Sequence, residues 1–155
     1  MKVNELMRLQ WTPRYMPVNV VFNNEYRGLY LLTETVNHGE GRLDVDEDSG
    51  YIVELDPYWW NEDLYVPSTF PESMNYTFKY PDSDDITEAQ LSYITAALDT
   101  LETSVVDGTY PERVDVESFA RWMLAHDILG NSDGAGSNIF LTKYDSTSAS
   151  PFKMG

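Results

Sequence analysis

Four short segments in the first half of the chain are rich in apolar, β-branched and aromatic residues and are separated by polar stretches, which is the pattern of β-strands. These segments are residues 18–22, 29–36, 51–55 and 75–80. The first two flank residues 23–28, an asparagine- and glycine-bearing stretch that suits a tight turn, so they predict a β-hairpin. Apolar side chains occupy both faces of its second strand, and we therefore expect the hairpin to be substantially covered.

Two segments in the second half carry the period of an amphipathic helix. In the first of them, Thr87 and Gln90 match a capping box. The apolar residues that follow recur at helical spacing and predict one buried stripe: Leu91, Ile94, Leu98, Leu101 and Val105.

The second helix is predicted over residues 116–129, with Asp115 as its N-cap and Gly130 just past its end. Phe119, Met123, Leu124 and Ile128 are expected to face inward. Strands followed by helices predict an α+β fold with a mainly antiparallel sheet. We interpret residues 1–155 as a single partial domain, mainly β over residues 1–85 and mainly α over residues 86–155, truncated at its C-terminus.

Composition excludes several classes of partner. The chain is 42% hydrophobic and 14% aromatic, which is enough apolar surface for a packed core. Its net charge of −16 repels nucleic acid and anionic membrane surfaces. No apolar run approaches the length of a membrane span, and the absence of cysteine rules out thiolate chemistry. Cations, a metal-borne nucleotide or a basic protein substrate remain compatible partners.

The stretch between the second helix and a strand predicted over residues 138–144 carries the candidate chemistry. Asp133 and Asn138 are five positions apart in a glycine-rich loop. Protein kinases use this spacing in a catalytic loop, where the Asp takes the proton of the substrate hydroxyl and the Asn binds Mg²⁺. The same residue types also build ordinary solvated turns, so the spacing alone leaves both interpretations open.

Four segments resemble the CotH family, the atypical protein kinases similar to spore coat protein H. Residues 23–34, NNEYRGLYLLTE, are similar to its N-G-x-Y-x-G-x-Y-x-L-x-E hairpin. Residues 115–122, DVESFARW, resemble its helix start, and residues 129–141, LGNSDGAGSNIFL, resemble its GN-x-D…N-x-x-L loop. Residues 153–155, KMG, resemble the beginning of its K-M-G-P-x-W-D-x-D segment. The four matches follow the order of the family.

The resemblance implies a divergent kinase-like fold that binds ATP and Mg²⁺ and phosphorylates protein hydroxyls. It makes Asp133 the catalytic aspartate and Asn138 a metal-side residue. The metal-binding Asp of the family lies in the W-D-x-D part, past Gly155, so we expect residues 1–155 alone to show little or no activity. The resemblance and the acidic composition together favour an extracellular or cell-envelope location.

A kinase also needs a cation that holds the nucleotide phosphates, and Lys79 is the candidate by location. The resemblance places the lysine of the family on a strand nearer residues 51–54. The alternative is that Lys79 is an ordinary strand lysine whose ammonium extends to water. Glu34 or Glu54 is the expected ion-pair partner. Arg27 and Gly28, at the hairpin tip, are expected to cover the phosphates.

Two further clusters have alternative interpretations. The acidic run over residues 44–50 suggests a calcium loop but lacks the glycine and glutamate spacing of an EF-hand, which favours a solvated turn. The aromatic residues around Trp59, beside acidic residues, suit either a sugar-binding surface or a loop packed over the sheet. The rival functions are therefore a non-catalytic pseudokinase-like scaffold and a carbohydrate-binding module. The sequence adjoining Gly155 discriminates between a kinase and a scaffold, since W-D-x-D there supports the kinase.

Overall fold

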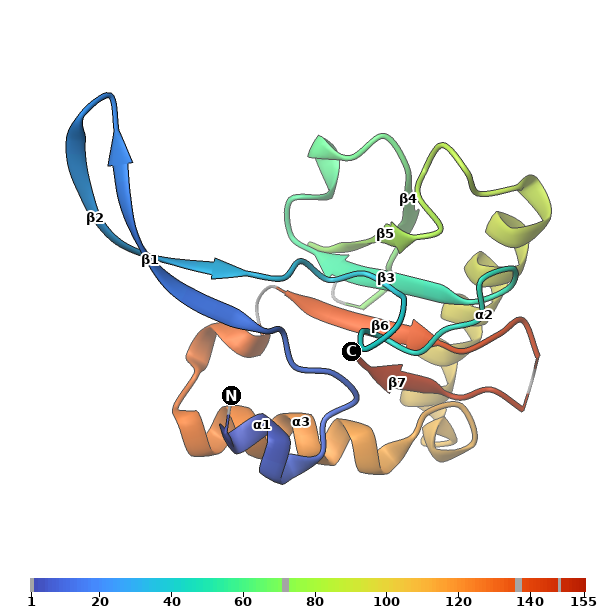
Figure 1. The fold of residues 1–155 in the computed structure, drawn as a ribbon. Coiled ribbons are helices and arrows are strands. Elements are labelled where there is room, and N and C mark those ends of the chain that lie inside the picture. The colour runs from blue at the N-terminus through green and yellow to red at the C-terminus, as the bar shows by residue number, and fades with distance from the viewer. Residues whose placement is uncertain (1, 71–72, 136–137, 148) are drawn as a thin grey trace.

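The computed structural model describes residues 2–70, 73–135, 138–147 and 149–155 (Figure 1). Its elements in chain order are α1 (Lys2–Met7), β1 (Tyr15–Phe22), β2 (Glu25–Thr33), β3 (Tyr51–Asp56), the 3₁₀ turn η1 (Trp59–Asn61), β4 (Tyr65–Pro67), β5 (Asn75–Tyr80), α2 (Glu88–Asp107), η2 (Tyr110–Glu112), α3 (Val116–Leu129), η3 (Ser132–Ala135), β6 (Ile139–Lys143) and β7 (Phe152–Met154). Within these ranges no helix combines the length and the apolarity that crossing a bilayer requires.

The described strands form two antiparallel sheets, which confirms the α+β prediction. One is the β1–β2 hairpin, and the other has the order β4-β5-β3-β6-β7. Two of its strands, β6 and β7, follow the helices in the chain, and β6 pairs directly with β3. Strands from both halves of the sequence therefore share one sheet.

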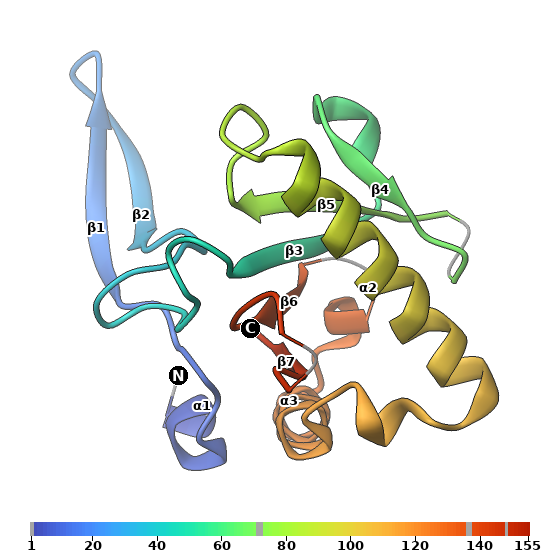
Figure 2. The ribbon, with the colours of Figure 1, turned by 90° about the vertical axis from the view of Figure 1, so that its right-hand side faces the viewer.

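Helix α2 covers one face of the five-stranded sheet (Figure 2). Tyr51 and Val53 of β3 are fully buried on that face, together with Ile94 and Leu98 of α2. Because successive side chains of a strand point to opposite faces, the residues between them face away from α2. The larger core therefore lies between α2 and the sheet. Glu54 is directed to the opposite face, which α2 leaves open and where Leu43 and Val45 pack on Ile52 in a second, smaller cluster.

Helix α2 begins as the sequence predicts. The Thr87 hydroxyl accepts a hydrogen bond from the backbone N–H of Gln90, and the Gln90 side chain accepts one from the backbone N–H of Thr87. The helix ends at Gly108, whose φ of 75° lies in the left-handed region that glycine adopts without strain. Both ends of the helix that buries the core are thus fixed by local chemistry.

Replacing Thr87 with alanine is expected to lower the free energy of unfolding by about 1 kcal/mol, the usual effect of losing an N-cap. Thr95→Ala is the matched control, because the exposed Thr95 hydroxyl bonds the Leu91 carbonyl in the helix interior, where alanine is the better helix former. Urea denaturation of both variants makes the comparison. Equal destabilisation by the two substitutions would contradict the role of the cap.

The buried stripe of α3 differs from the prediction. Phe119 packs against the core as expected, but Met123, Leu124 and Ile128 are 61%, 49% and 56% exposed. The helix contacts β7 and α1 instead through a stripe that includes Ala125, which is 1% exposed. A helix with apolar residues around much of its circumference cannot be oriented from periodicity alone, and the neighbouring elements decide which stripe is buried.

The expectation that the hairpin is covered was wrong. Strands β1 and β2 pair with each other and project from the body of the molecule (Figures 1 and 2). Large apolar side chains on both strands are exposed by half or more: Tyr15, Met16, Val21, Phe22, Tyr26, Leu29, Tyr30, Leu31 and Leu32. An apolar pattern shows that a strand can be covered, but among the described residues no element packs on this ribbon.

Candidate functional site

An ion pair crosses the open face of the five-stranded sheet. The Lys79 ammonium of β5 lies 3.1 Å from a carboxylate oxygen of Glu54 on β3. Both side chains are largely shielded from solvent, with exposures of 29% and 13%. A second carboxylate, that of Glu62, follows η1 and lies 3.9 Å from the same ammonium. Of the two partners that the sequence offered for Lys79, the structure places Glu54 beside it.

Burial raises the pKa of Glu54 above its ordinary value, because a shielded carboxylate loses hydration. Repulsion from Asp56 and Glu62 acts in the same direction, whereas the contact with Lys79 lowers the pKa in part. Such a pair contributes little to stability, since the loss of hydration offsets the attraction. Perturbed groups of this kind gather at functional sites.

The raised pKa predicts a pH-dependent stability. Glu54 holds its proton more tightly in the folded chain, so its contribution to the free energy of unfolding is fully present below the ordinary pKa of 4.5 and is lost as the pH rises through the raised value. Urea unfolding from about pH 4 to about pH 8 should show wild type losing stability relative to Glu54→Gln as the pH rises. Glu40→Gln, at an exposed carboxylate that is not among the groups perturbing Glu54, is the control. A difference that is constant or grows with pH would contradict this account.

Asp56 anchors the end of β3 next to this pair. Its buried carboxylate accepts hydrogen bonds from the Tyr58 backbone N–H at 2.7 Å and from the Thr77 hydroxyl at 3.3 Å. These contacts tie β3 to β5 and fix the path of the loop that brings Glu62 over the sheet. Asp56 is therefore a structural group, and both of its oxygens already accept hydrogen bonds.

The loop between α3 and β6 carries Asp133. Helix α3 begins at the N-cap Asp115 and ends at Gly130, whose φ is 61°, as the sequence predicts. The exposed Asp133 then lies in η3, with its backbone N–H bonded to the Asn131 side-chain oxygen at 3.3 Å. Gly136 and Ser137, which complete the loop of the motif, lie outside the described residues.

Asn138 stands at the start of β6. It is exposed and has a left-handed φ of 56°, a conformation that asparagine tolerates better than most residues. The next residue, Ile139, pairs with Leu55, and Phe140 pairs with Glu54. Two residues of strand separate Asn138 from the position opposite Glu54, a distance of about 7 Å. The register thus brings the end of the Asp133–Asn138 loop to the strand that carries Glu54.

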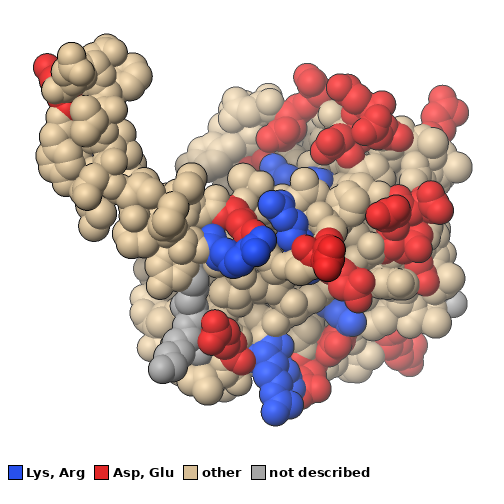
Figure 3. Space-filling model, viewed as in Figure 1, with Lys and Arg blue, Asp and Glu red and all other residues tan. Residues whose placement is uncertain are grey.

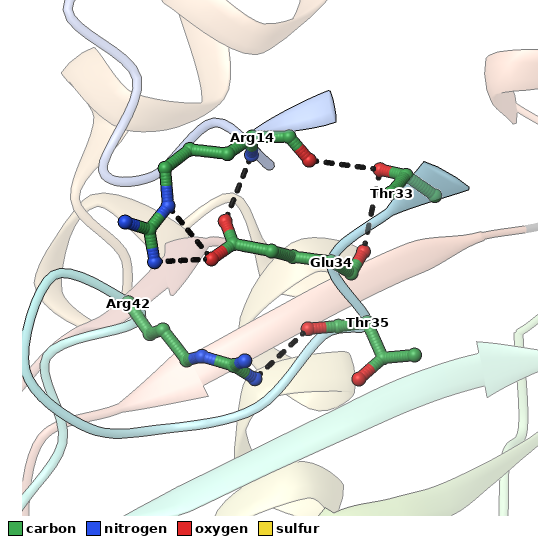
Figure 4. A network of polar contacts seen from close by, with 5 residues as sticks. All are labelled: Arg14, Thr33, Glu34, Thr35 and Arg42. Atoms are coloured by element: carbon green, nitrogen blue, oxygen red, sulfur yellow. Dashed lines mark hydrogen bonds and ion pairs between the residues drawn. The ribbon is translucent and has the colours of Figure 1, made fainter. Parts of the chain in front are cut away.

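Three predicted residues lie elsewhere. Glu34 accepts hydrogen bonds from the backbone N–H and the Nε of Arg14, each at 2.8 Å, at the base of the hairpin (Figure 4). These bonds hold the pKa of Glu34 below its ordinary value. Arg27 pairs with Glu25 at the hairpin tip, at 2.8 Å, and Gly28 beside it has a φ of 107°. The tip of the hairpin projects away from the five-stranded sheet, to which β5 and its Lys79 belong (Figure 1).

Several Lys and Arg side chains of this acidic molecule lie on the face seen in Figure 3, with one further group at its lower edge. Lys and Arg side chains gather near the middle of the face seen in Figure 3, between the hairpin and the body. Asp and Glu are spread over the upper and right-hand parts of the same face. An anionic ligand approaching this side therefore meets its positive charge at the centre.

Several contacts of the site were missed from the sequence. Arg14 as the partner of Glu34, and Glu62 as the second carboxylate near Lys79, depend on loops that fold back, and no local signal marks them. His126, which the sequence places only on a helix face, bonds Asn131 across the end of α3. Its spacing of five residues from an asparagine just past a helix-ending glycine is the signal that could have found it.

The acidic run and the aromatic loop make local contacts. Asp46 accepts hydrogen bonds from the backbone N–H groups of Asp48 and Ser49 and from the Ser49 hydroxyl, and these bonds lower its pKa. Among the residues that the structure describes, no group of three or more His, Asp or Glu could hold a metal ion. Trp59 packs on Tyr65, with 4.5 Å between the ring centroids, while Trp60 is 60% exposed.

A comparison with known protein families matches the model described as CotH kinase protein over residues 9–154. Neither curated proteins nor solved structures give a significant match. The family match begins just past α1 and extends over the described elements from β1 to β7.

Proposed function

Because the chain belongs to the CotH kinase family, we propose that its domain transfers the γ-phosphoryl group of ATP to serine or threonine hydroxyls of a protein substrate. The observation that carries the proposal is the ion pair of Lys79 and Glu54 on the open face of the sheet. Glu54 lies on β3, which pairs with β6, the strand that follows the Asp133–Asn138 loop. Strands β3 and β5 hold Glu54 and Lys79 rigidly, and the end of α3 holds the Asp133–Asn138 loop. Positioning of this kind supplies most of the catalysis in phosphoryl transfer.

Each residue has one task in the proposal. Lys79 donates hydrogen bonds to phosphate oxygens, and Glu54 orients its ammonium, a role that justifies keeping a desolvated carboxylate on the sheet. Asp133 accepts the proton of the attacking hydroxyl. Arg27 and Gly28 reach the phosphates when the hairpin closes over the open face. Glu34, engaged with Arg14, braces the base of that hairpin.

The oxygen atom that the loop offers suits Mg²⁺ as kinases usually bind it. Mg²⁺ binds through one or two protein oxygens together with nucleotide phosphates and water, and does not need an all-protein cage. Asn138 would hold it through its amide oxygen. When bound, Mg²⁺ neutralises charge on the β- and γ-phosphates. We also propose an extracellular or cell-envelope location, on the basis of the family and of the net charge of −16.

The test uses a longer polypeptide that contains these 155 residues and, after Gly155, the W-D-x-D segment that the resemblance to the family leads us to expect. Incubation with radiolabelled Mg·ATP and a panel of serine and threonine peptides should give labelled peptide. A thermal-shift series with Mg·ATP and with oligosaccharides separates the alternatives. Stabilisation by Mg·ATP without transfer would favour a pseudokinase-like scaffold. Stabilisation by oligosaccharides alone would favour a carbohydrate-binding module that uses the exposed Trp60 region.

A further inference from the structure

The side chain of Asn131 bridges two groups at the end of α3. Its Nδ2 lies 3.0 Å from Nδ1 of His126, and its Oδ1 accepts the backbone N–H of Asp133 at 3.3 Å. An amide nitrogen can only donate, so Nδ1 of His126 must accept. The imidazole is then the neutral tautomer with its proton on Nε2. If the Asn131 amide were rotated by 180°, its NH₂ group would face the Asp133 N–H, and the hydrogen bond between Asn131 and Asp133 would be lost.

Two further contacts fix the imidazole in place. Its ring packs on Trp122 of the preceding turn, with 4.0 Å between the ring centroids. The backbone of Gly134, in the same η3 turn as Asp133, also lies close to the ring. A Cβ at Gly134 would lie 2.0 Å from Nδ1, so only glycine lets the loop approach the ring this closely. The ring is thus held between the helix that carries it and the loop that follows.

We propose that His126 is a positioning residue for Asp133, acting through Asn131. It touches neither substrate nor nucleotide. His126 fixes the position of the Asp133 backbone in two ways. Its Nδ1 accepts a hydrogen bond from the Asn131 side chain, which in turn binds the Asp133 N–H, and its ring packs against Gly134. The catalytic part of this inference rests on the proposed function, in which Asp133 is the base. Moving the base out of line with the attacking hydroxyl lowers the rate of transfer steeply.

The structural arm of the test uses the 155-residue chain and needs no activity. Long-range ¹H–¹⁵N NMR of the histidine rings should show the Nε2–H tautomer for His126. Gly134→Ala should shift the Asp133 amide resonance in the wild-type background and have a much smaller effect in a His126→Ala background, because the added methyl then has room. An Nδ1–H tautomer, or an equal Gly134→Ala effect in both backgrounds, would overturn the proposal.

The catalytic arm compares two conservative variants in the longer polypeptide. At position 126, asparagine places its side-chain amide oxygen near the position of the histidine Nδ1, whereas glutamine places its amide oxygen near the position of Nε2. His126→Gln should lower kcat roughly ten- to a hundredfold with the KM for ATP unchanged, and His126→Asn should recover most of that loss. Equal losses in both variants would overturn the positioning role. Absence of transfer by the wild type would instead refute the proposed function, and the NMR arm would still decide the geometry.

Discussion

Replacing Asp133 with alanine is expected to lower phosphoryl transfer roughly a hundred- to ten-thousandfold, the range that a positioned general base supplies. The loss should fall on kcat, because Asp133 acts on the acceptor hydroxyl and does not hold the nucleotide. The KM for ATP should change little. The measurement is the initial rate of peptide labelling by the longer polypeptide at saturating Mg·ATP.

The fold should survive this substitution. Asp133 is exposed, and among the residues that the structure describes the hydrogen bond that fixes its place uses its backbone N–H and not its carboxylate. Exposed substitutions of this kind usually change the free energy of unfolding by no more than about 0.5 kcal/mol. Asp127→Ala, in the last turn of α3, is a nearby control that should keep full activity. Full activity of Asp133→Ala would show that another group is the base.

Replacing Lys79 with methionine is expected to weaken Mg·ATP binding roughly ten- to a hundredfold, because a charge-assisted hydrogen bond contributes about 1.5–3 kcal/mol. Methionine keeps most of the volume of the stem and removes the charge. Isothermal titration calorimetry of Mg·ATP into the wild type and the variant measures the change. Lys79→Arg, which keeps the charge but alters its shape, should have a smaller effect.

The methionine variant leaves Glu54 shielded and without its nearest cation. The double variant Lys79→Met with Glu54→Gln removes that unpaired charge, so it separates lost nucleotide binding from lost stability. We expect the double variant to be as stable as the wild type at neutral pH and still to bind Mg·ATP weakly. Unchanged affinity in both variants would exclude Lys79 from the nucleotide site.

Features encoded by neighbouring residues could be predicted from the sequence. The hairpin turn at Asn23 and Asn24 uses left-handed φ values of 51° and 61°, which asparagine tolerates. The capping box of Thr87 and Gln90 and the ends of α3 follow the same logic, because each depends on contacts within a few residues. The strands β3 and β5 were also located, since their patterns reflect burial on the sheet.

Features that depend on distant contacts could not be predicted. The choice of Glu54 over Glu34 as the partner of Lys79 follows from the register of β3 and β5, which includes a shift between Ile52 and Val53 that no local pattern reveals. The buried stripe of α3 depends on where α1 and β7 pack. The position of the hairpin tip relative to Lys79 likewise depends on the whole fold, because its strands pair only with each other among the described elements.

The central claim is that the open face at Lys79 and Glu54 and the loop at Asp133 and Asn138 form one active site, in which the γ-phosphate of the nucleotide bound at Lys79 lies next to the loop. A ¹⁵N-resolved NMR titration of the 155-residue chain with Mg·ATP tests this claim without requiring turnover. We expect the largest shifts at the Lys79 and Glu54 amides and at Asp133 and Asn138, with smaller shifts along β6. Shifts confined to the Trp59–Asn61 turn and its neighbours, or no shifts at millimolar Mg·ATP, would contradict the account.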